Sequence, residues 1–219
     1  MNVDRLRQAI AAAREHEAET DQLSQFLQGR IGELHRSIQL PVDNSVPALL
    51  NFVIRYIEHV PEFVEAVSDI SKQAGIEPSI EPVIQVACEF FLSPPGVMEQ
   101  WLEEQNSLVA LMDEAYLAHR LIEEVNDRYM THLGAPLVPM DMTRSNLIVH
   151  HLIGEDFANQ LDRAVEVAVN QLQQRQADSS KLTSFVDRCR QRDIDRELIR
   201  WPCLTDSLSI NLMLDGRVH

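Results

Sequence analysis

The chain has 219 residues, of which 45% are hydrophobic and 24% charged, a composition typical of a globular protein and not of a disordered or fibrous one. Its formal net charge of −15 argues against a nucleic-acid-binding protein, because phosphate recognition depends on clustered Lys and Arg side chains. A chain of this length can bury one large core, so we expect a single domain over residues 1–219.

Residues 1–40 are expected to form one long N-terminal helix. Every third or fourth residue of this segment falls on a seam that is apolar at both ends and polar in the middle, around Glu17. A slightly rotated apolar stripe that includes Leu23 and Phe26 is also present. We therefore expect the helix to pack on its own chain, and dimerisation through it is the alternative.

Residues 41–202 are expected to form a helical core. The first helix of this region is capped near Asn44, and its apolar residues cover most of the circumference, which predicts a central position. Pro61 is expected to bend or restart this helix, because proline removes a backbone donor. Gly75 is expected to end it as a left-handed C-cap, and a shorter helix follows over about 79–92.

Two long helices are predicted over about 97–133 and 143–176, and a last helix over about 180–200. A short connector with two prolines separates the long helices, so we expect them to be antiparallel neighbours. The first has an apolar stripe at the helical period that includes Leu108, Leu111, Ala115, Ile122 and Tyr129. The buried face of the second is expected to include Leu147, Ala158, Leu161, Val165 and Val169.

The segment 203–219 is expected to be an extended tail. Apolar residues at every second position predict a half-buried strand over 207–214, and they are Leu208, Ile210, Leu212 and Leu214. The strand could pair with 136–142 or with a second chain, or the tail could fold over the bundle as helix or coil. The fold class predicted for the whole chain is all-α, a bundle of six or seven helices with this tail.

Two His-x-x-x-Glu pairs lie on the predicted long helices, His119 with Glu123 and His151 with Glu155. Residues four apart share one face of a helix, so each pair presents an imidazole and a carboxylate to the same side. Both histidines fall beside the apolar stripes of their helices. The rise per residue allows all four side chains to lie in one layer of the bundle.

This cluster has two interpretations. Two imidazoles and two carboxylates would suit zinc, iron or manganese, with further ligands from Glu58, His59, Glu62 or Glu89. The other interpretation needs no cofactor: buried His–Glu hydrogen bonds fix the register of the helices, and stability then responds to pH near neutrality. We favour the second, because neither the ExxH motif of helical di-iron proteins nor the HExxH motif of zinc hydrolases occurs.

Cysteine usage and the absence of apolar segments bear on the compartment. Cys88, Cys189 and Cys203 are too few and too scattered for a disulfide framework, which favours a reducing compartment. No signal-peptide core and no uncharged apolar stretch of about 18 residues occurs. We expect a soluble cytoplasmic protein with no membrane partner.

The negative charge is concentrated in residues 41–140, which carry 16 acidic and 4 basic side chains. Solvated helix faces explain this charge, and a docking surface for a basic partner is the alternative. Our leading hypothesis is a non-enzymatic helical protein that binds another protein or a second copy of itself. A basic protein is one option for that partner. The alternative is a metal-dependent helical-bundle enzyme, such as an oxidoreductase, that uses His119, Glu123, His151 and Glu155.

Overall fold

The computed structural model describes residues 3–93, 107–133, 141–175 and 210–212. Within these ranges it confirms an all-α bundle, and no helix there is long and apolar enough to cross a membrane. A 3₁₀ turn, η1, spans Ile31–Glu33. The α-helices are α1 (Val3–Thr20), α2 (Gln22–Arg30), α3 (Ser45–Ala74), α4 (Glu77–Leu92), α5 (Leu108–Leu133), α6 (Thr143–Ile153) and α7 (Glu155–Arg175).

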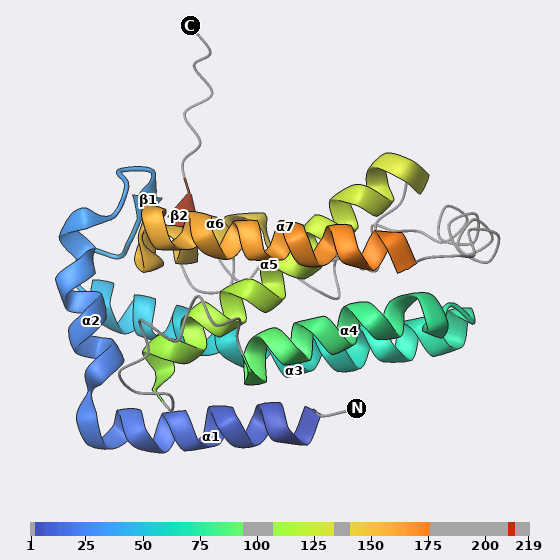
Figure 1. Ribbon diagram of the computed structural model, residues 1–219. Coiled ribbons are helices and arrows are strands. Elements are labelled where there is room, and N and C mark those ends of the chain that lie inside the picture. The colour runs from blue at the N-terminus through green and yellow to red at the C-terminus, as the bar shows by residue number, and fades with distance from the viewer. Residues whose placement is uncertain (1–2, 94–106, 134–140, 176–209, 213–219) are drawn as a thin grey trace, which may run out of the picture.

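Helix α5 is the centre of the bundle. In Figure 1 it runs diagonally between α3 and α4 on one side and α6 and α7 on the other, and it contacts every other α-helix of the described residues. Burial of a large apolar side chain contributes about 1.5–3 kcal/mol to the free energy of folding, so the buried side chains of this helix supply much of the stability of the core. The residues of its predicted inner stripe are all buried, namely Leu108, Leu111, Ala115, Ile122 and Tyr129.

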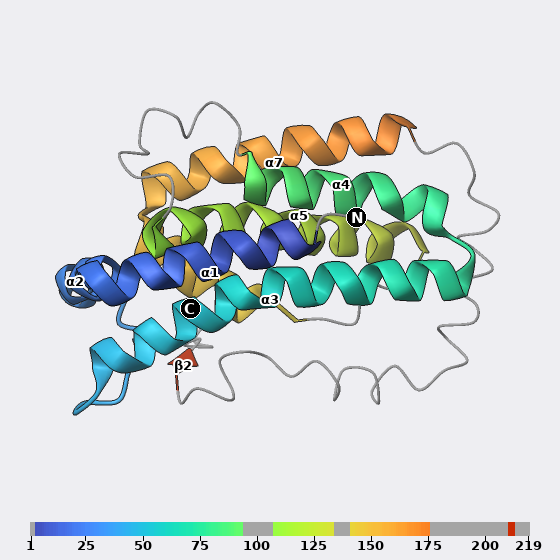
Figure 2. The same cartoon turned by 90° about the horizontal axis from the view of Figure 1, so that it is seen from below.

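Helices α3 and α4 form a hairpin whose turn was predicted correctly. Helix α3 continues through Pro61 without restarting and changes direction near its middle (Figure 2). Gly75 ends it with a left-handed φ of 70°. The N–H of Gly75 donates to the carbonyl of Lys72, and the N–H of Ile76 donates to the carbonyl of Ser71, which satisfies two carbonyls at the helix end.

The first 40 residues do not form the single helix predicted from the seam. The chain turns at Asp21, whose φ of 52° is left-handed, and α2 then runs only to residue 30. Glu17, in the polar middle of the seam, is 9% exposed. Its carboxylate accepts the backbone N–H groups of Leu23 at 2.7 Å and Ser24 at 3.1 Å, and so caps the start of α2. The polar middle of the seam therefore marks a junction between two helices.

Helix α1 packs on its own chain. Its apolar face is buried in the core through Leu6, Ile10 and Ala13. On its polar flank Arg7 pairs with Glu65 of α3 at 2.7 Å, and Arg14 pairs with Glu58 of the same helix. These two ion pairs neutralise part of the acidic middle of the chain.

The predicted helix over 143–176 is two helices, α6 and α7. Gly154 separates them with φ of 102° and ψ of 139°, a conformation that residues with a Cβ rarely adopt. His151 and Glu155 therefore lie on different helices and are not one turn apart on a common face. Leu147 is 39% exposed, which contradicts its predicted burial, whereas the other residues predicted for this face are buried, namely Ala158, Leu161, Val165 and Val169.

Strand β2 (Asn211–Leu212) confirms extended backbone in the tail, but its partner was not predicted. It pairs antiparallel with β1 (Ile38–Gln39), in the connection between α2 and α3, and not with 136–142. Ile38 of β1 and Ile210, which precedes β2, are both buried. The rest of the predicted tail, the helix expected over 180–200 and the first part of the helix expected over 97–133 lie outside the described residues.

Replacing Glu17 with alanine is expected to lower the free energy of unfolding by about 1–2 kcal/mol, because two N–H groups at the start of α2 lose their acceptor. Urea unfolding followed by circular dichroism measures this change. Glu15→Ala, at an exposed position of the same helix, is the control and should alter stability by less than about 0.5 kcal/mol. Equal losses in the two variants would contradict the capping role.

Candidate functional site

His119 lies in the core, at the contact between α5 and α3. Its side chain is 0% exposed, and its ring packs against Tyr56 and Phe63, with ring centroids 4.2 Å and 5.3 Å away. Its Nε2 lies 3.3 Å from Nδ1 of His59, so one ring donates a hydrogen bond to the other. Its Nδ1 makes no well-formed hydrogen bond. The predicted burial of His119 is confirmed, but its partner is an imidazole and not Glu123.

Both rings of this histidine pair are neutral at neutral pH. Burial, reinforced by the like charge of Arg55, lowers the pKa of His59 to about 4. Burial lowers the pKa of His119 well below its ordinary value, and His59 lowers it further, while the Ala115 carbonyl opposes the shift. An uncharged pair avoids the cost of burying an unpaired cation. The two imidazoles therefore form an internal contact that joins α3 to α5.

Glu123 takes part in a different contact, between α5 and α6. Its Oε2 accepts hydrogen bonds from Nη1 of Arg120 and from Nδ2 of Asn146, the latter at 2.6 Å. Oδ1 of Asn146 accepts the hydroxyl of Tyr56 at 2.6 Å, so the amide bridges α5 to α3. Glu123 thus accepts hydrogen bonds from a guanidinium and an amide, and not from His119 as the sequence predicted.

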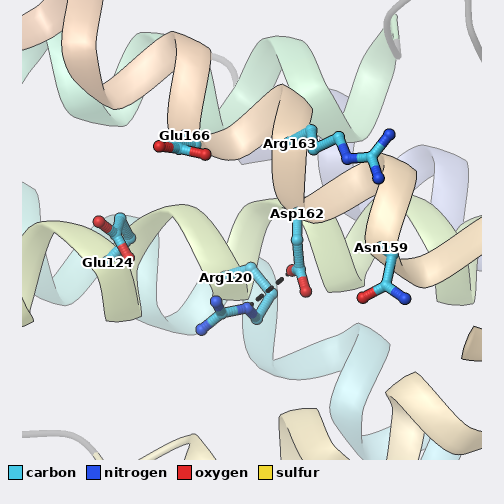
Figure 3. A pocket seen from close by; sticks show the side chains of 6 residues that line it. All are labelled: Arg120, Glu124, Asn159, Asp162, Arg163 and Glu166. Carbon is cyan, nitrogen blue, oxygen red and sulfur yellow. Dashed lines mark hydrogen bonds and ion pairs between the residues drawn. The ribbon is translucent and has the colours of Figure 1, made fainter.

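Arg120 extends this network to α7. Its Nε donates to Oδ1 of Asp162 at 3.0 Å, and the same oxygen accepts the hydroxyl of Tyr116 at 3.0 Å. Figure 3 shows Arg120 and Asp162 facing each other between the two helices. Although burial lowers it, the pKa of Arg120 is raised overall by the carboxylates of Glu123 and Asp162, so the guanidinium stays charged. We name these six side chains the Arg120 network: Tyr56, Tyr116, Arg120, Glu123, Asn146 and Asp162.

The Arg120 network opens at one side into a groove of about 620 Å³ between α5 and α7. Figure 3 shows the side chains that line it, which are Arg120, Glu124, Asn159, Asp162, Arg163 and Glu166. Charges of opposite sign alternate here, and Glu124 is further paired with Arg128 at 2.9 Å. Ligand pockets are usually apolar concavities with a few polar groups. This groove lacks that character, because all six of its lining side chains are polar or charged.

His151 and Glu155 lie in other surroundings. The ring of His151 stacks on His35, with centroids 5.6 Å apart and an interplanar angle of 11°, and lies 6.0 Å from the ring of His150. Burial lowers the pKa of His151, as do His150 and His35, whereas Glu155 opposes the shift. Glu155 is exposed in the first turn of α7, where a carboxylate stabilises a helix N-terminus. None of the contacts described for His119 and Glu123 therefore involves His151 or Glu155.

No three or more His, Cys, Asp or Glu side chains are arranged to hold a metal ion in the part of the chain that the structure describes. The structure therefore does not support the predicted metal centre, for which the expected ligands were His119, Glu123, His151 and Glu155. Of the additional candidates, His59 does lie beside His119, but Glu58 pairs with Arg14. Glu62 and Glu89 are exposed.

One buried acid was not anticipated from the sequence. Glu114 on α5 is 6% exposed, and burial raises its pKa to about 8, with a further contribution from neighbouring Asp113. A carboxyl with a raised folded-state pKa is protonated where the unfolded chain has already lost the proton. It therefore reduces stability progressively as the pH rises from about 4.5 to about 8.

Sequence reasoning also missed most of the Arg120 network. Asn146 is buried and lies three and seven residues before Val149 and Ile153, which are buried on the same face of the chain. A polar residue inside an apolar stripe was therefore the available signal. Asp162 follows the buried Leu161 in the chain, and its pairing with Arg120 could not be deduced from position alone.

Comparisons with protein-family models, with curated proteins and with solved structures find no match to this chain.

Tyr56→Phe and Asn146→Ala are each expected to lower the free energy of unfolding by about 1–3 kcal/mol, because each leaves a buried partner unsatisfied. The double variant should lose about 1 kcal/mol less than the sum, since the two side chains share one hydrogen bond. Urea unfolding of the four proteins measures this coupling. Tyr56→Phe combined with Thr20→Ala, at an exposed position of α1, is the control and should be additive; additivity of the first pair would exclude the bond.

The histidine pair is expected to make the protein less stable at acidic pH. The unfolded chain takes up a proton on His59 below about pH 6.5, whereas the folded protein does so only near pH 4. The free energy of unfolding therefore falls as the pH drops through this window, by about 3 kcal/mol for His59, and the loss stops growing below pH 4. Urea unfolding at pH 7.5 and pH 5 measures the difference.

The double variant His59→Leu, His119→Leu should lose less stability between these two pH values than the wild-type protein. His16→Gln, on α1, is the control and should follow the wild type. Glu114 acts in the opposite direction and is common to all three proteins, so the comparison isolates the histidines. Parallel pH profiles for the wild type and the double variant would contradict the neutral pair.

Proposed function

We propose that this protein is a non-enzymatic helical protein that acts by binding another protein. The observation that carries the proposal is that two of the candidate site residues, His119 and Glu123, are bonded to other side chains of the bundle and not to a shared centre. Glu123 is held by Arg120 and Asn146, and His119 is fully buried against His59. Side chains that are bonded in this way stabilise one arrangement of helices.

The distribution of shifted pKa values supports the same proposal. Catalytic sites usually gather perturbed acids and bases around a shared pocket. Here His59, His119 and Glu114 have shifted pKa values, are each buried and lie outside the groove between α5 and α7. Arg120, whose pKa is raised, does line that groove, but it is paired with Asp162 and stays charged. A chemical reaction would need such groups at a surface that a substrate can reach.

The partner we propose is a different protein and not a second copy. The two segments that the sequence suggested for self-association have partners within the chain: α1 packs on α3, and β2 pairs with β1. A net charge of −15 favours a basic protein and disfavours a nucleic acid. The scattered cysteines, of which Cys88 is a free thiol, support a cytoplasmic location.

Metal analysis of protein purified without a histidine tag tests the proposal against the metal-dependent alternative. After incubation with zinc, iron or manganese and removal of the excess, we expect substoichiometric metal, because the four predicted ligands do not converge. The matched variants are His119→Ala with His151→Ala, and His16→Ala on α1 as a control. Stoichiometric metal that is lost only in the double variant would overturn the proposal and support the helical-bundle enzyme.

A further inference from the structure

A second set of histidines, distinct from the buried His59–His119 pair, lies at the end of the bundle where α6 meets α7. The ring of His35, from the connection between η1 and β1, stacks on His151 with centroids 5.6 Å apart. The ring of His150 meets His151 edge-on at 6.0 Å. Figure 1 shows α2, β1 and the junction of α6 with α7 at this same end. His35 is exposed and the other two rings are partly exposed, so protons reach all three from the solvent.

His35 is bound in its own turn as a neutral ring. The N–H of Ser37 donates to Nδ1 of His35 at 3.3 Å, and the Ser37 hydroxyl lies 2.7 Å from the same nitrogen. A backbone N–H can only donate, so Nδ1 carries a lone pair and the proton of the ring is on Nε2. The carbonyl of His35 accepts the N–H of Ile38 at 2.9 Å. A protonated ring has an N–H at both positions and cannot accept from Ser37, so a charge on His35 disrupts this turn.

The surroundings of His151 oppose a charge on its ring. Burial lowers the pKa of His151, and His150 and His35 lower it further, whereas Glu155 at the start of α7 opposes the shift. Within the described parts of the chain, neither His35 nor His151 lies within ion-pair distance of a carboxylate. Two imidazolium rings at the separation of this stack repel each other. The stack is therefore most stable when both of its rings are neutral.

The other elements around these rings do not balance a charge on the stack. Nε2 of His150 lies 3.9 Å from Oδ2 of Asp162 on α7, and its ring lies 6.1 Å from the ring of Tyr116 on α5. Arg30 of α2 lies beside the turn between α6 and α7, and its guanidinium pairs with Glu33 at 2.9 Å. A charge on His150 thus has a carboxylate nearby. The two stacked rings have instead a guanidinium in their neighbourhood and each other.

The stack is connected to the strand pair through a short stretch of backbone. Ile38 begins β1 three residues after His35, and it lies opposite Leu212 of β2. Each strand has two residues, and a two-stranded pair so short is marginal without further contacts. The contact of His35 with α6 is one such contact, and the burial of Ile38 is another. Movement of the turn at His35 therefore weakens the pairing of β1 with β2.

We propose that the His35–His151 stack is a pH-sensitive switch, which holds β1 on β2 when its rings are neutral and releases β2 when they are protonated. The open form binds protons more tightly than the closed form, because the rings no longer repel each other and Nδ1 of His35 no longer has to accept a hydrogen bond. A fall in pH therefore favours the open form. The change begins near about pH 6.5, where an ordinary imidazole titrates, and grows below it. The inference does not rest on the proposed function, because it concerns only contacts within the chain.

Amide hydrogen exchange of the full-length protein, followed by NMR at pH 7.5 and pH 5.5, tests the switch. Protection factors, corrected for the intrinsic effect of pH on exchange, are compared for the amides of β1 and β2. We expect protection to be about three- to tenfold lower at pH 5.5, which corresponds to the repulsion of two charges about 6 Å apart in partly solvated surroundings. Protection of these amides should be well below that of the central amides of α5, which exchange only when the whole chain unfolds.

Two variants remove the charge from either side of the stack. His35→Asn keeps an acceptor for the Ser37 N–H, because the side-chain oxygen of asparagine takes the place of Nδ1, and His151→Phe keeps an aromatic surface. In each variant the decrease in protection between the two pH values should be smaller than about twofold. His16→Gln, on α1, is the matched control and should show the wild-type decrease. All four proteins retain the buried histidine pair, so its effect on global stability is common to them.

The position of the ring proton of His35 at pH 7.5 is a second readout. Imidazole nitrogen chemical shifts distinguish a proton on Nε2, which we expect, from a proton on Nδ1, which would overturn the inference. An unchanged wild-type protection factor, an equal decrease in the wild type and both stack variants, or protection of β1 and β2 equal to that of α5 would also overturn it. Circular dichroism at both pH values establishes that each variant is folded. None of these outcomes affects the proposed function, which is tested separately by metal analysis.

Discussion

The structure depends on one half-buried guanidinium. Arg120, on the central helix, donates to Glu123 of its own helix and to Asp162 of α7, and Glu123 in turn holds Asn146 of α6. A charge inside a protein is tolerated only when it is paired and hydrogen-bonded, so each of these partners depends on the others. Through Asn146 the network reaches Tyr56 of α3. Four helices are therefore held in one register by a single connected set of side chains.

The histidine pair lies next to this network, but its side chains are neutral and not charged and paired. His59 and His119 have no carboxylate among the causes of their pKa shifts, and burial keeps them neutral. Tyr56 connects the two systems, because its ring packs on His119 while its hydroxyl donates to Asn146. In this region the charged side chains are paired with one another, and the buried histidines are neutral. This explains how so many polar side chains fit into one core.

The side chains of the Arg120 network are bonded within the bundle, so a partner would bind at the surface. Of the charged side chains that line the groove beside the Arg120 network, Arg120 pairs with Asp162, and Glu124 pairs with Arg128. Charges that are already paired leave little for a ligand to gain.

The sequence by itself determined what depends on residues close together in the chain. The 3.6-residue period predicted the buried face of α5, including His119, and Gly75 ended α3 through its own backbone conformation. Only the tertiary structure decided the partners. His119 meets a histidine 60 residues away, Asn146 meets a tyrosine 90 residues away, and the tail meets β1 from the opposite end of the chain. It also divided two expected helices, at Asp21 and Gly154. Periodicity states which side of a helix is buried, but the side chain that faces it is set by how the other helices pack.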